Sequence, residues 1–268
     1  MLIRRVLVVF VFLGVAVFRP FALDAQVAVR HAEGLLHGFL ELSTLDGEIL
    51  AEGEQTQIAR GDQVTTHLVF RFKDGSLHEE TTVFSQRQNF KLLNTRLVQK
   101  GPAFKVPMDF SVIASSGQVT IAYTDEHGDK KTLSEHLELP ADVYNGMIST
   151  LTKNLPTKNV GTTFHVVAAG SKPQLVKVEI HPVGEDSFSV GRLRRVQAMQ
   201  YAVKVDLSAV TGLIAAIVGK RPQETHLWVL QGKAPAFFRS EGPLYHGGPI
   251  WRIELVSPRW ADGLRKNN

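Results

Sequence analysis

Apolar and polar residues alternate one by one over much of this chain, and this alternation limits its fold more than any other feature. Over residues 64–72, one face of an extended strand would carry Val64, Thr66, Leu68, Phe70 and Phe72, and the other Thr65, His67 and Arg71. Similar runs occur over 119–124, 176–181, 201–207 and 251–255. A period of two residues indicates strands with one buried face. The chain is therefore expected to be mainly β.

Short turn signals separate these runs. Glycine and turn-forming polar residues occur at 46–47, 73–76, 115–117 and 127–129. Links this short join antiparallel neighbours and leave no room for a crossover helix, so the first half is expected to form a meander of hairpins. A sheet with this many strands curls or splits into packed layers. The prediction is a large curved antiparallel sheet, half-barrel or clam-like, with one or two helices packed on it.

Two segments depart from the alternation and predict helices, near residues 141–154 and 208–219. In the first, Val143, Met147 and Leu151 recur every four residues after a proline, as in an amphipathic helix. Gly146 lies inside it and weakens it by about 1 kcal/mol relative to alanine. The second segment is apolar on nearly every side, so protein, lipid or a ligand must cover it. Burial within the protein is the expectation.

Residues 1–25 have the features of a secretory signal peptide. Arg4 and Arg5 precede an uncharged apolar run over 6–18, and Ala25 offers a small residue at a cleavage site. The run is shorter than the roughly 20 residues of a membrane span, although an uncleaved anchor is the alternative. No later segment could span a bilayer. We expect residues 26–268 to form a single domain in the bacterial periplasm or secreted from the cell, a location that suits a chain without cysteine.

Composition and motif spacing argue against several functions. The chain has 30 basic and 26 acidic residues; outside the signal segment, which holds Arg4, Arg5, Arg19 and Asp24, 27 and 25 remain, or +2. Such a balance gives no case for nucleic acid. The ten histidines lack metal-binding spacing, and no nucleophile elbow or phosphate loop is present. We expect a non-enzymatic protein with no cofactor and no metal.

Large apolar residues give one hypothesis for a binding site. On the strands and in the 208–219 segment they could line a cleft of the curved sheet that holds an acyl chain or another apolar ligand. The candidates are Phe70, Phe72, Leu213, Ile217, Trp228 and Trp251. Ordinary core packing is the competing and more frequent reason for such residues.

The chain contains Gly101-Pro102, Leu139-Pro140, the stretch 188–191 and the closing stretch 242–255. Together these segments resemble a family of uncharacterised exported bacterial proteins. The likeness covers most of the chain after residue 25 and implies no activity. The order of elements also resembles the periplasmic lipoprotein-carrier type of fold, in which a curved antiparallel sheet wraps an apolar cleft. That resemblance implies lipid or lipoprotein handling.

Three functions are therefore considered. The first is a non-enzymatic exported protein that binds a lipid or another apolar small molecule. The second is a cell-envelope interaction or assembly module that binds a partner protein through an edge or face of the sheet. The third is a hydrolase whose site is assembled from distant residues. We rank them in that order.

Overall fold

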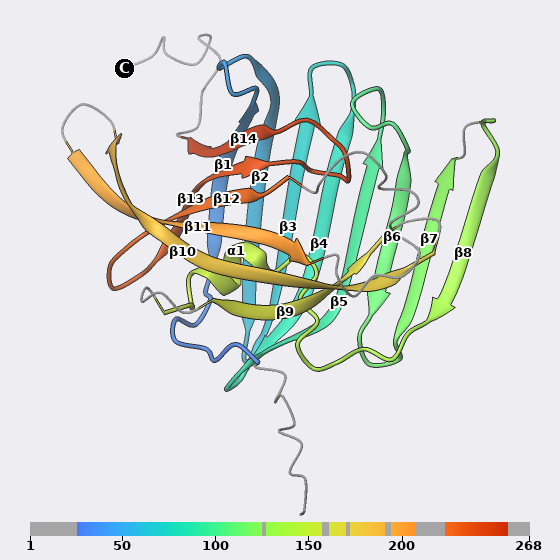
Figure 1. Ribbon diagram of the computed structural model, residues 1–268, viewed down its shortest axis with the longest axis horizontal. Helices are drawn as coiled ribbons and strands as arrows, with labels where there is room; N and C mark the ends of the chain where they lie inside the picture. The colour runs from blue at the N-terminus through green and yellow to red at the C-terminus, as the bar shows by residue number, and fades with distance from the viewer. Residues whose placement is uncertain are drawn as a thin grey trace, which may run out of the picture.

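Strands form most of the computed structural model, which describes residues 26–124, 127–156, 161–169, 172–190, 194–206 and 223–256. The first half of the chain supplies β1 Leu36–Ser43, β2 Ile49–Arg60, β3 Gln63–Phe72, β4 Leu77–Gln86, β5 Phe90–Lys100, β6 Met108–Ile113, β7 Gln118–Thr124 and β8 Lys130–His136. The second half supplies β9 Thr162–Ala168, β10 Gln174–Val190, β11 Arg194–Asp206, β12 Thr225–Leu230, β13 Ala236–Gly242 and β14 Trp251–Val256. One short helix, α1 Ile148–Thr152, connects the halves (Figure 1).

The strands of the described residues belong to one antiparallel sheet that does not close on itself. Its order is β8-β7-β6-β5-β4-β3-β2-β1-β14-β13-β12-β11-β10-β9, so each half is a meander, and β8 and β9 are the two ends. The halves are joined where β1 pairs with β14, with Leu40 opposite Leu255. The predicted curved antiparallel sheet and the predicted meander over the first half are confirmed.

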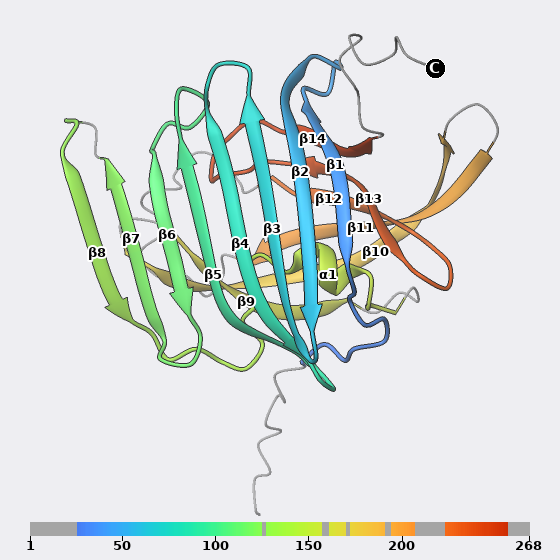
Figure 2. The same ribbon diagram turned by 180° about the vertical axis from the view of Figure 1, so that it is seen from behind.

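The sheet folds back at the β1–β14 pairing, so that its two halves lie as two layers. The strands of the second half run across those of the first, and α1 lies between the layers (Figures 1 and 2). The main core cluster accordingly combines Phe84 and Val112 of the first half with Phe164 and Ile180 of the second, around Leu151 of α1. Burying each such side chain contributes about 1.5–3 kcal/mol.

The alternation read from the sequence sets which face of each strand is buried. In β3, Val64, Phe70 and Phe72 are buried on the inner face, the face toward the other half. The outer face of the first half instead carries cross-strand ion pairs, such as Arg96 with Asp109 at 2.6 Å. A sheet with one packed face and one solvated face explains the period-two pattern.

The helix expected near 141–154 is much shorter in the structure. Gly146 has φ +71°, a left-handed conformation that interrupts a right-handed helix. Before it, Val143 forms a single bridge to β9 between two turns: the backbone N–H of Tyr144 donates to His165 O at 2.9 Å, and that of His165 donates to Asp142 O at 3.0 Å. The helix thus begins only at Ile148. The second predicted helix, 208–219, lies outside the described residues.

A set of buried polar groups ties the N-terminal segment to the end of α1. Lys153 Nζ lies 2.6 Å from Glu33 Oε1, with side chains only 11 % and 8 % exposed. Asn154 Oδ1 accepts from the backbone N–H groups of Arg30 and His31 at 2.8 and 2.7 Å. These bonds hold α1 in place between the two layers. None of the helical segments in the described part of the chain has the length and hydropathy of a membrane span.

Candidate functional site

A line of four partly exposed side chains crosses the inner face of the first half. Gln55 of β2 lies opposite Leu68 of β3, Leu68 lies opposite Glu80 of β4, and Glu80 lies opposite Leu97 of β5. Each of the four has intermediate solvent exposure. We call these four residues the inner row.

The lines of residues on both sides of the inner row are fully buried. One consists of Gln57, Thr66, Thr82 and Thr95, and the other of Gly53, Phe70, His78 and Gln99. The inner row also lies between two core clusters, since Leu97 packs against the main one and Leu68 against a smaller one around Phe70 and Phe72. Phe237 of β13 packs against both. Solvent therefore reaches a line of positions that runs between two packed regions.

The polar groups in the flanking lines bind one another. The hydroxyls of Thr82 and Thr95 are 3.0 Å apart. Gln99 Nε2 donates to Leu244 O at 3.0 Å and lies 3.1 Å from His78 Nδ1. Burial lowers the pKa of His78 to about 4, so its ring is neutral at ordinary pH and Nδ1 accepts the amide hydrogen.

Glu80 differs from its neighbours because its carboxyl has no hydrogen bond or ion pair within the described residues. Burial raises its pKa from 4.5 to about 7. The chain before α1 passes directly over it: a Cβ on Gly146 would lie 2.9 Å from Glu80 Oε1 and 2.0 Å from Thr82 Oγ1. Glycine is required there by both the close approach and the positive φ. The result is a carboxyl that changes charge near neutral pH and that lies between two leucines of the neighbouring strands.

Three of the residues predicted to line a cleft lie together at one end of the inner face. Phe70, Phe72 and Trp251 belong to the smaller core cluster, where the Phe72 and Trp251 ring centroids are 5.5 Å apart. Phe104 and Tyr245 complete the aromatic contacts around Trp251, at 6.5 and 6.2 Å. Phe70, Phe72 and Trp251 are at most 8 % exposed, so they border the inner row as packed core. Ligand contact by these three residues stays a prediction.

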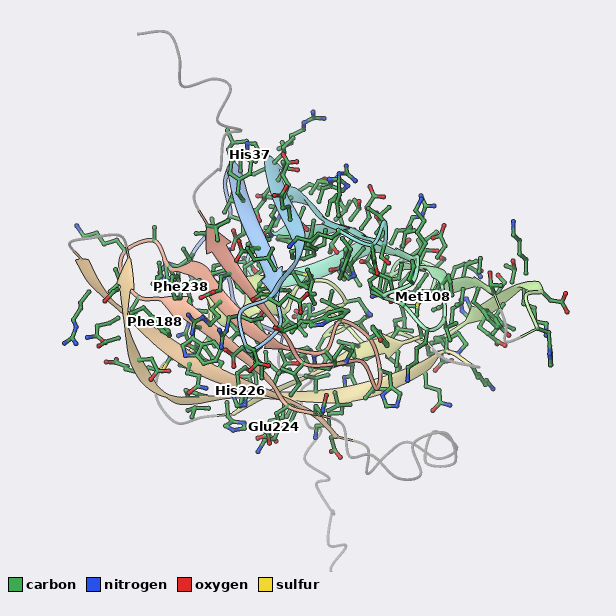
Figure 3. The ribbon with its side chains drawn as sticks, turned by 90° about the horizontal axis from the view of Figure 1, so that it is seen from above. His37, Met108, Phe188, Glu224, His226 and Phe238 are labelled. Atoms are coloured by element: carbon green, nitrogen blue, oxygen red, sulfur yellow. The ribbon has the colours of Figure 1, made fainter. Side chains whose placement is uncertain are left out.

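Trp228 lies apart from that group. It is on the opposite face of β12 from Leu227 and Val229, which belong to the main core cluster. Its Nε1–H donates to Asp186 Oδ2 at 2.6 Å. Nearby, the Arg239 guanidinium stacks 4.7 Å from the Phe188 ring centroid, and Phe188 and Phe238 lie side by side, 4.8 Å apart (Figure 3). The last two candidates, Leu213 and Ile217, lie outside the described residues.

The sequence analysis did not single out Glu80 or Gln55. The sequence did contain an indication of Glu80. It precedes Thr82 and Phe84 by two and four residues, so strand alternation places it on the same face of β4 as these buried residues. A charged residue on the buried face of a strand is unusual and indicates a possible functional site. Its position between two packed regions, however, depends on the second half of the sheet, which the local pattern does not reveal.

Two features bear on catalysis. His165 Nδ1 lies 3.0 and 2.9 Å from the two carboxylate oxygens of Asp142, and no Ser or Thr hydroxyl of the described residues binds this histidine. No group of three His, Asp or Glu side chains within the described ranges could hold a metal ion. The Asp142–His165 pair instead fastens the segment before α1 to β9.

Comparison with known proteins gives one structural similarity. No protein-family model and no curated protein matches the chain. The chain is similar to the crystal structure of a beta-barrel-like protein of the domain of unknown function DUF1849 from Brucella abortus. The similarity covers 86 % of this chain and 100 % of the Brucella chain. The sequence identity is 10 % and the TM-score 0.44.

Proposed function

We propose that this protein is an exported, non-enzymatic protein that binds a lipid or another apolar small molecule over the inner row. The observation that carries the proposal is the exposure of this row between two lines of buried residues. A fully packed pair of sheets would bury Leu68 and Leu97 as it buries Phe70 and Thr82. Leaving apolar surface in water costs roughly 25 cal/mol per Å², and an apolar ligand that covers it recovers this free energy.

The unclosed sheet supports the same proposal. Within the described residues the end strands β8 and β9 do not pair with each other, so strand hydrogen bonds do not close the space between the layers on that side. Inner-face apolar residues toward that side, Met108, Tyr123 and Leu133, are also partly exposed. Met108 lies on the side of β6 that faces the second half (Figure 3). An apolar chain entering between the layers would meet these residues first.

The test is extraction of the protein purified from bacterial cells without detergent, followed by mass spectrometry of the organic phase. We expect an apolar small molecule in near-stoichiometric amount. Leu97→Gln, on the inner row, should lose it, whereas Ile113→Gln, an exposed apolar residue at the end of β6, should retain it. A ligand-free extract, together with no uptake of an added monoacylglycerol, would overturn the proposal.

Docking of an envelope protein by strand addition is the second candidate, and β8 is the edge that it would use. The other end strand, β9, is covered by the segment before α1, where Val143 bridges His165 and the Asn145 side chain binds the backbone of Val167. The exposed residues of β8 include Lys130 and Lys131, and lysines on an edge oppose strand addition. A partner that copurifies stoichiometrically and is lost in Thr132→Pro would place this function first.

A further inference from the structure

We propose that Glu80 is the polar anchor of the ligand site, and that it donates a hydrogen bond to the carbonyl of an uncharged acyl ester or amide. This inference rests on the proposed function and adds to it the chemical class of the ligand. The site is the inner row, with Leu68 and Leu97 on either side of the carboxyl to receive apolar parts of the same molecule.

The position of Glu80 explains why a ligand would bind it. The carboxyl is in the middle of the solvent-reached row, and the polar groups nearest to it along β4 are already engaged: His78 with Gln99, and Thr82 with Thr95. A ligand that covers the row buries this carboxyl, and a buried polar group without a partner costs about 1–3 kcal/mol. A ligand that supplies a hydrogen bond avoids this cost, whereas a purely apolar ligand incurs it.

The surroundings of Glu80 favour a ligand that accepts a hydrogen bond and carries no charge. Because the pKa of this carboxyl is about 7, its protonated form is well populated at neutral pH and dominates below it. A free fatty acid would bring a carboxylate next to Glu80 without a compensating cation on the strands beside it, where β3 and β5 present Leu68 and Leu97. An ester or amide carbonyl needs only the O–H that the protonated carboxyl provides.

Other titratable groups packed around this site do not compete for the role. On β4, His78 stays neutral above about pH 4. In the segment before α1, Asp142 is bound to His165, and the Tyr144 hydroxyl donates to Phe90 O at 3.1 Å. The second half contributes Tyr201 to the main core, and burial raises the pKa of this phenol above its usual value. Glu80 is thus the group whose protonation should govern binding near neutral pH.

Gln55 provides an internal comparison on the same row. It lies two strands from Glu80, roughly 10 Å away at the spacing of neighbouring strands, so one carbonyl cannot bind both side chains. Its amide does not ionise, and it is separated from the carboxyl by Leu68. Gln55→Leu should therefore leave any pH dependence of binding unchanged.

The experiment is titration of the full exported chain with monoolein, an uncharged monoacylglycerol ester, by calorimetry at about pH 5.5 and about pH 8.5. If only the protonated carboxyl binds, the dissociation constant should rise about thirtyfold between these values, following the fraction of competent protein. Glu80→Gln retains a donor and should bind equally at both pH values. Glu80→Leu has no donor and should bind about tenfold more weakly at the lower pH.

Glu79→Gln is the matched control, because Glu79 is the next residue on β4 and pairs with His67 on the outer face. It should keep the thirtyfold change. Monoolein binding that is independent of pH in the wild type, or that strengthens as pH rises, would overturn the role of Glu80 while leaving the proposed function in place. Persistence of the pH effect in Glu80→Gln would do the same. Absence of monoolein binding at either pH would overturn both.

Discussion

Replacing Glu80 by glutamine should make the stability of the protein less sensitive to pH between 4.5 and about 7, and the size of this effect follows from the burial of the carboxyl. Burial raises the pKa of Glu80 from 4.5 to about 7. Between these values the folded protein holds a proton that the unfolded chain releases, so the free energy of unfolding falls as pH rises. The stability that Glu80 contributes is fully present below pH 4.5 and is lost as pH rises through about 7.

The difference between the two pKa values corresponds to about 3 kcal/mol, at about 1.4 kcal/mol per pH unit. Glutamine has the same shape and cannot ionise. The free energy of unfolding of Glu80→Gln, measured relative to the wild type, should therefore rise by about 3 kcal/mol between pH 4.5 and about 7.5 and then level off. The total stability of an ordinary domain is about 5–15 kcal/mol, so the protonation of the Glu80 carboxyl controls a substantial part of it.

The assay is urea unfolding at a series of pH values, followed by the fluorescence of the buried Trp228 and Trp251. The control is again Glu79→Gln, whose carboxylate is 40 % exposed and 2.8 Å from His67. Its difference from the wild type should stay within about 1 kcal/mol at every pH. A difference between Glu80→Gln and wild type that does not change with pH would refute the reasoning.

Three further changes should alter stability, each measured by the same urea titration. Burial lowers the pKa of His78 from 6.5 to about 4. The stability that His78 contributes is therefore present above pH 6.5 and is lost as pH falls through about 4. His78→Leu should remove this acid-induced loss of about 3 kcal/mol. Gly146→Ala should lower the free energy of unfolding by at least about 3 kcal/mol, because the backbone there is left-handed and the new Cβ would lie 2.0 Å from Thr82 Oγ1. Adding Thr82→Ala to this variant should recover part of the lost stability. Gly128→Ala, with φ +85° and open space around its Cβ, is the comparison and should cost about 1–2 kcal/mol. Lys153→Met should cost about 3–5 kcal/mol because it leaves Glu33 buried without its ion pair; a loss below about 1 kcal/mol would contradict this.

The alternation of side chains was sufficient to predict most of the first half. It gave the inner faces of β3 and β7, because each strand there has one packed and one solvated face. The helix before residue 154 could not be placed correctly from spacing alone. Val143 and Met147 are buried as the helical pattern predicts, yet Val143 reaches the core from a single bridge to β9 between two turns. The local pattern records burial and does not distinguish these two ways of achieving it.

The candidate site was less predictable, because it depends on contacts between residues far apart in the chain. Aromatic side chains in strands predicted either a cleft or a core, and Phe70, Phe72 and Trp251 are packed together. What separates the exposed inner row from the buried lines beside it is how the second half crosses the first. Phe237, which packs against both core clusters, is more than a hundred residues from Glu80 in the sequence. No periodicity within β4 contains that information.

His78 and Glu80 have opposite effects on the pH dependence of stability although they lie two residues apart on one face of β4. Between pH 4.5 and 6.5 the loss of stability from Glu80 as pH rises offsets the gain from His78. Both side chains are uncharged over this range, so the inner face is then closest to an apolar surface. Above about pH 7 Glu80 is ionised in the folded protein as well, which places a negative charge on the inner row, and its effect on stability no longer changes with pH. A ligand that accepts the proton of Glu80 in a hydrogen bond stabilises the protonated form, and it must therefore raise the pKa of this carboxyl further. The loss of stability between pH 4.5 and about 7 and the loss of ligand affinity above about pH 7 would then have a common origin in this one proton, so Glu80→Gln should abolish both together.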